Sequence, residues 1–172
     1  IVLMDISNTT DYVAENREAR LSRKSLISHF CKVRNFTLYL TEPLEVEDYV
    51  VQAMDKASPV KWHLAHVSWF FETFVLDEAI ANYQPHTRSK RGLLSRPTVR
   101  EVWEYREYVN KKILTFLEKA NEKQLAEFGP IVEIGIHHEQ QHQELMLTDL
   151  KYMFGQSPLY PVYRDLVQAT NN

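Results

Sequence analysis

Ten residues, 135–144, read GIHHEQQHQE. Positions four apart in an α-helix lie on one face, about 6 Å from each other, so a helix here places the rings of His138 and His142 side by side. The apolar stripe that includes both histidines at helical spacing is Ile131, Ile134, His138, His142, Leu145, Met146 and Met153. The pattern therefore predicts a long helix whose buried face carries two imidazoles that are close enough to share a metal ion.

Two interpretations of this pair stay open on the residues alone. Buried histidines are often core residues satisfied by hydrogen bonds, and two ligands do not make a metal site. A third histidine, His66, lies in the stretch WHLAH at residues 62–66, on a helical face shared with Trp69 and Phe70. Helix bundles build metal sites from side chains of facing helices in this way. We therefore predict that His66, His138 and His142 bind a metal, and that His63 and His137, which fall off these faces, do not.

The donor set indicates a working site but does not choose the metal. Iron(II), zinc and nickel all accept imidazole. Three neutral imidazoles leave the charge of the ion uncompensated and its other positions open, so an anionic substrate such as a thiolate fits. Glu139, Gln141 and Glu144 lie near enough in the sequence to hold the ring N–H groups of the ligands.

A zinc peptidase is the main rival interpretation of the same stretch. Residues 138–142 read HEQQH and match the pattern HExxH, with Glu139 as the general base. A metzincin requires glycine at position 145 and histidine at position 148, where this chain has Leu145 and Thr148. The chain also shows no strand that would hold a peptide, so the peptidase is the weaker hypothesis.

Composition and periodicity predict an all-α fold. A chain of 172 residues suits one domain that buries about 70% of its unfolded surface. It has only four glycines and seven prolines, and its apolar residues recur at intervals of three and four residues, as they do in helices. Long helices are expected over about 21–40, 59–76, 98–120 and 130–154, with a short one at 47–51. The start signals are Ser58-Pro59, Thr98 with Glu101, and Gly129-Pro130, and Gly155 is expected as a left-handed cap. Four helices with short joins predict an antiparallel four-helix bundle.

Charge and hydropathy exclude several classes of function. There are 20 Lys and Arg against 23 Asp and Glu, for a net charge of -3, and no basic run suits nucleic acid. No apolar run is long enough to span a membrane. The single cysteine, Cys31, fits a reducing compartment, and we expect a cytoplasmic protein. We expect a loosely ordered N-terminal arm at 1–20, the metal-binding bundle at 21–157 and a C-terminal tail at 158–172 that leads toward a second domain.

Several motifs in order carry a resemblance to a known family. They are Phe36-Thr37-Leu38 through Glu47-Asp48-Tyr49, SPVKWHLAH at 58–66 with WFFETF at 69–74, RGLLSRPT at 91–98, and residues 137–151. These motifs resemble the DinB-like N-terminal domain of the sulfoxide synthases of ergothioneine biosynthesis. The likeness covers most of residues 30 to 163.

This resemblance implies a specific chemistry. It implies a DinB-like four-helix bundle that binds non-haem iron(II) through His66, His138 and His142. The family uses oxygen to join a thiol, cysteine or γ-glutamylcysteine, to the imidazole C2 of trimethylhistidine and forms a sulfoxide. By the same resemblance, Arg88 and Arg91 bind the carboxylates of the thiol substrate, and Gln141 helps to hold trimethylhistidine.

The resemblance also implies a partner domain. Similar enzymes carry a C-terminal domain of the formylglycine-generating type, which supplies a catalytic tyrosine and much of the pocket. We expect this chain to bind metal alone and to need that domain for turnover. The alternatives are a standalone DinB-like thiol transferase that uses zinc or nickel, and a bundle that only binds a metal or a protein. For the basic loop at 82–92, a solvated connection is the other interpretation.

Overall fold

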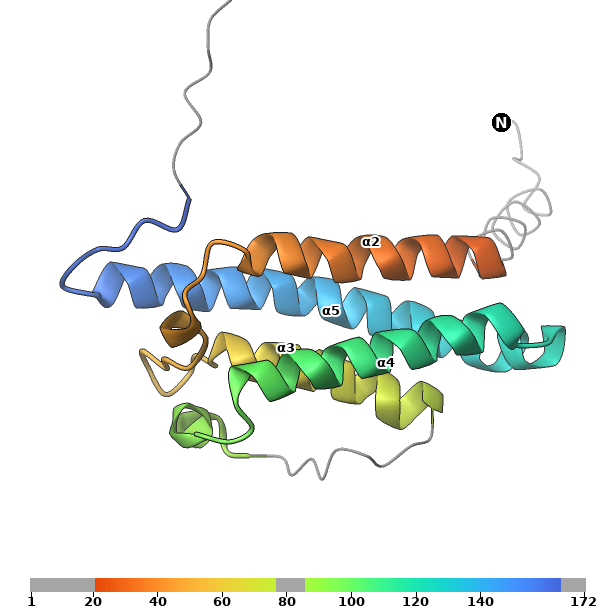
Figure 1. Cartoon of the computed structure of the whole chain (residues 1–172), viewed down its shortest axis with the longest axis horizontal. Helices are drawn as coiled ribbons and strands as arrows, with labels where there is room; N and C mark the ends of the chain where they lie inside the picture. The colour runs from red at the N-terminus through yellow and green to blue at the C-terminus, as the bar shows by residue number, and fades with distance from the viewer. Residues whose placement is uncertain (1–20, 77–85, 165–172) are drawn as a thin grey trace, which may run out of the picture.

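Four long helices lie side by side in a computed structural model that describes residues 21–76 and 86–164 (Figure 1). They are α2 (Arg23–Thr41), α3 (Val60–Phe71), α4 (Val99–Lys119) and α5 (Glu122–Gln156). The short elements are η1 (Val46–Tyr49), the π-helical turn η2 (Glu72–Leu76), which continues α3, and η3 (Arg88–Leu93). The predicted all-α class and the bundle are confirmed. The expected arm at 1–20, residues 82–85 of the basic loop and residues 165–172 of the tail lie outside the described residues.

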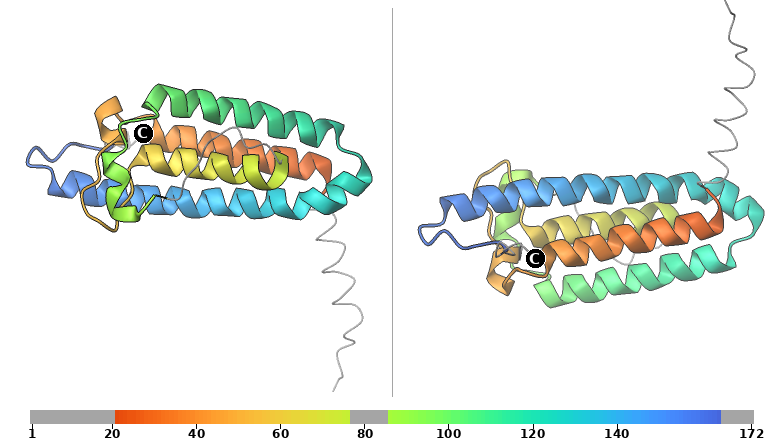
Figure 2. Two further views of the ribbon diagram at one scale, coloured as in Figure 1. Left: turned by 90° about the horizontal axis from the view of Figure 1, so that it is seen from below. Right: turned by 90° about the horizontal axis from the view of Figure 1, so that it is seen from above.

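The four long helices form two parallel pairs, and the two pairs run in opposite directions. α2 and α5 run one way and α3 and α4 the other, and Figure 2 shows α4 and α5 flanking α2 and α3 from both sides. The join between α4 and α5 is short, as expected, because Ala120 ends one helix and Asn121 caps the next. The join between α3 and α4 is long, contrary to the expectation of short joins, and α3 and α4 are therefore parallel. No helix of residues 21–76 and 86–164 combines the length and the apolar character that crossing a membrane requires.

Local capping signals explain where the helices begin. Thr98 and Glu101 form the predicted capping box of α4, with 3.2 Å from the Glu101 N–H to the Thr98 hydroxyl. The predicted start of the last helix at Gly129-Pro130 is wrong, since α5 begins at Glu122 and includes Pro130. Asn121 and Gln124 form a capping box there, and α5 accommodates Pro130 in its third turn, where the proline removes one backbone hydrogen bond and crowds the carbonyl four residues earlier.

Two smaller predictions about helix ends are also corrected. Pro59, rather than Ser58, is the N-cap residue of α3, and no side chain caps this end. Gly155 is part of α5, which continues to Gln156, and the described glycines all have negative φ. The helix ends where the chain turns at Ser157 and Pro158, so the predicted left-handed glycine cap is wrong.

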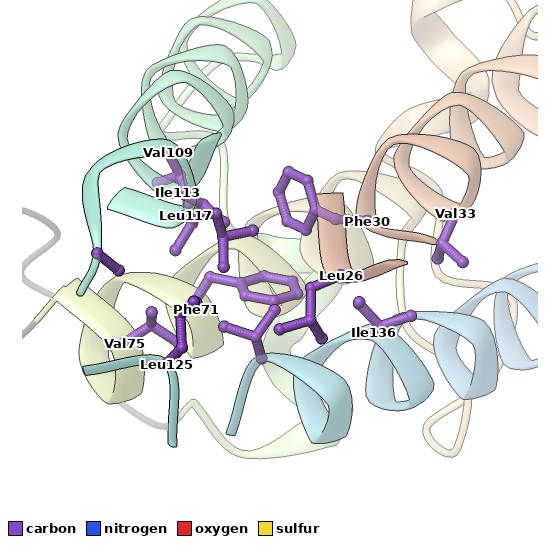
Figure 3. Close-up of a cluster of buried hydrophobic side chains, with 12 residues drawn as sticks. Leu26, Phe30, Val33, Phe71, Val75, Val109, Ile113, Leu117, Leu125 and Ile136 are labelled. Atoms are coloured by element: carbon purple, nitrogen blue, oxygen red, sulfur yellow. The ribbon is translucent and has the colours of Figure 1, made fainter. Parts of the chain in front are cut away.

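The core consists of two apolar clusters along the bundle axis. Figure 3 shows one of them, in which the Phe71 ring of α3 lies beside Leu26 and Phe30 of α2. The rings of Phe30 and Phe71 meet edge to face with centroids 5.2 Å apart. The second cluster lies toward the other end of the bundle and includes Leu40, Leu64, Val102 and Met146. Both clusters draw on all four long helices, so the helices fold as one unit.

A buried polar layer separates the two clusters. Every long helix contributes to it, through Arg34, Ser68, Arg106 and Glu139, and each of these residues is at most 3% exposed. The Glu139 carboxylate accepts hydrogen bonds from Arg34 at 2.8 Å, from Arg106 at 2.5 Å and from the Thr37 hydroxyl at 2.6 Å. Arg34 also donates to the Ser68 hydroxyl at 3.2 Å. Because these bonds join all four helices at one level, the layer favours a single register of α5 against its neighbours.

Candidate metal centre

Three histidine rings from two antiparallel helices meet at one side of the bundle. α3 contributes His66, and α5 contributes His138 and His142. One ring nitrogen of each lies within 4.8 Å of those of the other two. The ring centroids are 5.1 Å apart for His66 and His138, 4.9 Å for His66 and His142, and 4.6 Å for His138 and His142. The convergence that the sequence predicts is therefore confirmed.

A glycine permits the close approach of the two helices that carry the histidines. Gly135 is buried on α5, one turn before His138. A Cβ atom at this position would lie 2.5 Å from Cε1 of Phe71 and 3.0 Å from Cε1 of Phe70. Such distances are far below van der Waals contact, so only a residue without a side chain fits. The glycine thus sets the spacing at which the rings of His66 and His138 can face each other.

The cluster lies at the rim of the core, which corrects the predicted inward stripes. On the predicted buried stripe of α5, Ile134 is 59% exposed and Leu145 is 43% exposed. His66 and His138 are half-buried, whereas His63, which was predicted to lie off the inward face, is only 4% exposed. The helical turn at 60–64 is buried on more than one side: Lys61 Nζ donates to the Leu94 carbonyl at 2.7 Å, whereas His63 contacts His142 and Asp149 of α5.

The environment keeps the three imidazoles neutral at pH 7. Burial lowers the pKa of His66 to about 4 and that of His142 to about 2, and neighbouring imidazoles and the Arg91 guanidinium contribute to both shifts. Burial also lowers the pKa of His138, against the opposing effect of the Glu139 charge. A neutral imidazole has a free lone pair on one nitrogen, which a metal ion requires. The cluster is therefore in the protonation state of a ligand set.

The residues present fit a divalent metal ion. Three imidazole nitrogens are a donor set that suits iron, zinc and nickel. The buried Nδ1 of His138 has no hydrogen-bond partner within residues 21–76 and 86–164. Buried polar atoms are nearly always satisfied, so an unpartnered ring nitrogen on one of the three clustered histidines is consistent with a ligand at this place. Whether a metal binds there stays a prediction.

The cationic side chain of Arg91 lies beside this cluster. Its guanidinium stacks on the Trp62 ring, 3.4 Å from the centroid, and donates to the Ser58 hydroxyl at 2.8 Å. The Trp62 ring in turn stacks on His66, with centroids 4.5 Å apart. Arg88 is exposed, and its Nη1 lies 3.5 Å from the Lys56 carbonyl oxygen. The predicted roles of both arginines in substrate binding stay predictions.

A family model described as the DinB superfamily matches residues 29–146, well over half of the chain. The chain belongs to the DinB superfamily. The match runs from within α2 into α5 and includes His66, His138 and His142. No curated protein matches the chain. Membership gives the fold and agrees with a three-histidine cluster, and the activity has to be argued from the site.

The groups predicted to support the ligands of this DinB domain lie elsewhere. Glu139 does not hold a ligand ring, because its carboxylate faces Arg34 and Arg106 in the polar layer. Gln141 and Glu144 are exposed, and Gln141 lines a shallow depression with His138. The sequence does not predict the buried polar layer. Arg34 lies among the polar residues of an amphipathic helix, and such residues are expected to face solvent.

Two residues of this DinB domain that contact the site were not predicted. His63 Nδ1 lies 2.8 Å from His142 Nδ1, and His63 Nε2 lies 3.2 Å from Asp149 Oδ2. A signal is present in the sequence, because Asp149 lies seven residues after His142 and therefore on the same helical face. His63 falls outside the predicted site because the apolar pattern indicates only one buried face for α3.

Proposed function

We propose that this DinB domain binds iron(II) through His66, His138 and His142 and is the metal-binding part of an oxygen-dependent sulfoxide synthase. The reaction would join a thiol, cysteine or γ-glutamylcysteine, to trimethylhistidine in ergothioneine biosynthesis. The observation that carries the proposal is the cluster of three neutral imidazoles. The sequence motifs that resemble this family support the specific activity.

The open side of the cluster suits substrates. Three ligands from two adjacent helices occupy one side of an ion and leave the rest of its coordination sphere to other molecules. When bound, iron(II) supplies the positive charge that holds a thiolate and the electrons that dioxygen requires. His66 and His138 are half-buried, so the site opens to the surface. The proposed formylglycine-generating-type domain would close this side and exclude water.

Charged and polar groups around the cluster match the proposed substrates. The Arg91 guanidinium lies close enough to lower the pKa of His66 and His142 and would attract the carboxylates of the thiol. Gln141, which lines a shallow depression with His138, offers an amide for trimethylhistidine. We expect Arg88, on the same short helix as Arg91, to contribute a weaker attraction because it is exposed.

Aromatic rings beside the histidines suit a quaternary ammonium group. The Phe70 ring lies 4.9 Å from the rings of both His138 and Phe74, and the Trp69 ring lies 5.6 Å from that of His66. Ring faces attract cations, and quaternary ammonium ligands are commonly bound in this way. Trimethylhistidine carries such a group, so these rings support it as the second substrate.

A second candidate function rests on the same donor set. Three imidazoles accept zinc and nickel as readily as iron(II), and a bound zinc or nickel ion can activate a thiol without oxygen. The alternative is a metal-dependent thiol transferase. A bundle that binds a metal without catalysis would share the cluster and would show no thiol chemistry.

One anaerobic experiment separates these functions. The chain is loaded with iron(II), zinc or nickel, and binding of cysteine, γ-glutamylcysteine and trimethylhistidine is measured by calorimetry before air is admitted. We expect the iron form to bind a thiol and trimethylhistidine together, and to consume both in equal amounts in air when the partner domain is supplied. Thiol transfer by the zinc or nickel form without air would support the second candidate. Failure to bind any of the three metals would refute both.

A further inference from the structure

A chain of hydrogen bonds leads from α5 through α3 to one of the three histidines. Asp149 Oδ2 accepts the backbone N–H of Ser58 at 2.9 Å and lies 3.2 Å from His63 Nε2. The other ring nitrogen of His63, Nδ1, lies 2.8 Å from His142 Nδ1. His63 is 4% exposed and His142 is 9% exposed, so water has little access to the contact between the two rings.

The bonds of Asp149 decide where the protons lie. A carboxylate only accepts hydrogen bonds, so His63 Nε2 must carry a proton and donate it to Asp149. With a single proton on its ring, His63 has a bare Nδ1, which accepts. In that state the partner atom, His142 Nδ1, carries a proton and donates. This leaves the lone pair of His142 on Nε2, the nitrogen that remains for the cluster with His66 and His138.

We infer that His63 and Asp149 are positioning residues that hold His142 in the Nδ1-protonated tautomer and fix the orientation of its ring. The inference rests on the proposed metal-binding function, because a fixed tautomer matters when Nε2 is a ligand. Metal-binding histidines nearly always donate their other N–H to a carboxylate, a carbonyl oxygen or water, and such partners strengthen metal binding. Here a second imidazole, itself held by a carboxylate, takes that place.

Packing alone does not explain this arrangement. A buried histidine needs partners, but a partner could be any backbone carbonyl. His63 instead connects a carboxylate directly to a residue of the cluster. His138 differs, because its buried Nδ1 has no hydrogen-bond partner in the described part of the chain. The two histidines on α5 therefore differ: His142 has a hydrogen-bond partner that fixes its ring before any metal binds, and Nδ1 of His138 has none in this part of the chain.

The tautomer is tested first, without any metal. Nitrogen-15 NMR of the metal-free 172-residue chain at pH 7.5 distinguishes protonated from bare ring nitrogens, and a His142→Gln variant assigns the signals. We expect His142 to carry its proton on Nδ1 and His63 to carry its proton on Nε2. A His142 ring with its proton on Nε2 would overturn the inference. This result does not depend on whether the chain binds metal, so it separates the inference from the proposed function.

Metal affinity is tested next with cobalt(II), whose visible spectrum reports its ligands. His63→Phe keeps an aromatic ring and removes the acceptor, and we expect cobalt affinity to fall about 10- to 100-fold. His63→Asn restores an acceptor near the position of Nδ1 and should recover most of the loss. Circular dichroism establishes that each variant is folded. Equal affinities of the wild type and a folded His63→Phe variant would overturn the inference.

Asp149 and a surface residue complete the comparison. Asp149→Leu removes the group that fixes the proton of His63, so both tautomers of His142 should appear in the nitrogen-15 spectrum and cobalt affinity should fall. His137→Ala is the matched control, because the His137 side chain is 51% exposed and bonds to Gln140. It should leave both the tautomer and the affinity unchanged. A single, unchanged tautomer of His142 in Asp149→Leu would exclude a role for Asp149.

Discussion

The carboxylate of Glu139 on α5 lies 2.8 Å from the guanidinium of Arg34 on α2, and both side chains are at most 4% exposed. A second arginine, Arg106 of α4, reaches the other carboxylate oxygen at 2.5 Å. Two buried cations thus share one anion, next in sequence to His138. Because Glu139 is the common partner, the layer ties the register of the metal-binding helix to two other helices.

Removal of Glu139 should destabilise the fold severely. Glu139→Ala leaves Arg34 and Arg106 buried without a counter-charge, and breaking a buried ion pair in this way typically costs about 3–5 kcal/mol. Urea unfolding followed by circular dichroism measures the change. The matched control is Glu127→Gln, on the exposed face of the same helix, which should change the free energy of unfolding by less than about 0.5 kcal/mol. Similar values for the two variants would show that the layer does not hold the bundle together.

The same carboxylate should make stability depend on pH in the acid range. Although burial opposes ionisation, the charges and hydrogen bonds of Arg34 and Arg106 hold the pKa of Glu139 well below its ordinary value. The unfolded chain has a pKa of about 4.3 for this group. Its contribution is therefore complete above that value and is lost as the pH falls toward the folded pKa. Glu139→Gln cannot titrate, so its deficit relative to the wild type should shrink between about pH 5 and the acid limit of folding. If the stability difference between Glu139→Gln and the wild type stays constant over this range, the ionisation of Glu139 does not contribute to the pH dependence.

Gly135 should tolerate no side chain, although it lies within a helix. Alanine favours helices over glycine by about 1 kcal/mol, but at this position its Cβ would lie 2.5 Å from the fully buried ring of Phe71. We expect Gly135→Ala to destabilise the domain by about 1–3 kcal/mol, as overpacked cores do. A Cβ at Gly155, on the same helix, would meet no atom within 4 Å, so Gly155→Ala should be neutral or stabilising. Thermal unfolding of the two variants checks this, and equal shifts would contradict the close approach of α5 to α3.

Arg91 should contribute to substrate binding and not to metal binding. Arg91→Ala removes a cation that stacks on Trp62 beside the cluster, so thiol affinity should fall about tenfold or more, as expected for the loss of a charge-assisted hydrogen bond. Cobalt affinity should not fall. Calorimetry with γ-glutamylcysteine measures the first quantity and the cobalt spectrum the second. Arg100, exposed on α4, supplies the control variant Arg100→Ala, and an unchanged thiol affinity in Arg91→Ala would remove the proposed role.

Much of the fold was predictable because the signals are local. Apolar spacing located α2, α3 and α4, and the Thr98–Glu101 capping box located one helix start. The beginning of α5 was missed because Pro130 looks like a start signal, while the capping box at Asn121 lies in a polar stretch that looks like a turn. The parallel course of α3 and α4 depends on a long connection, and spacing within helices contains no information about it.

The site was predictable in part, and for a physical reason. Two histidines four apart on one helix and a third on another can be found from the sequence, and the three rings do meet. Their supporting groups depend on which side of each helix is covered by other segments. His63 is buried because it faces α5, where it contacts His142 and Asp149. Glu139 turns toward Arg34 because the opposite face of α5 meets α2. Such tertiary contacts do not appear in the periodicity of a single helix.

The central claim is that one metal ion binds at His66, His138 and His142. Its most direct test is the metal content of the purified chain after anaerobic loading with iron(II) and removal of unbound metal. We expect one ion per chain in the wild type and in His137→Ala, and almost none in folded alanine variants at positions 66, 138 and 142. Wild type without stoichiometric metal, or variants at these three positions that keep it, would contradict the claim.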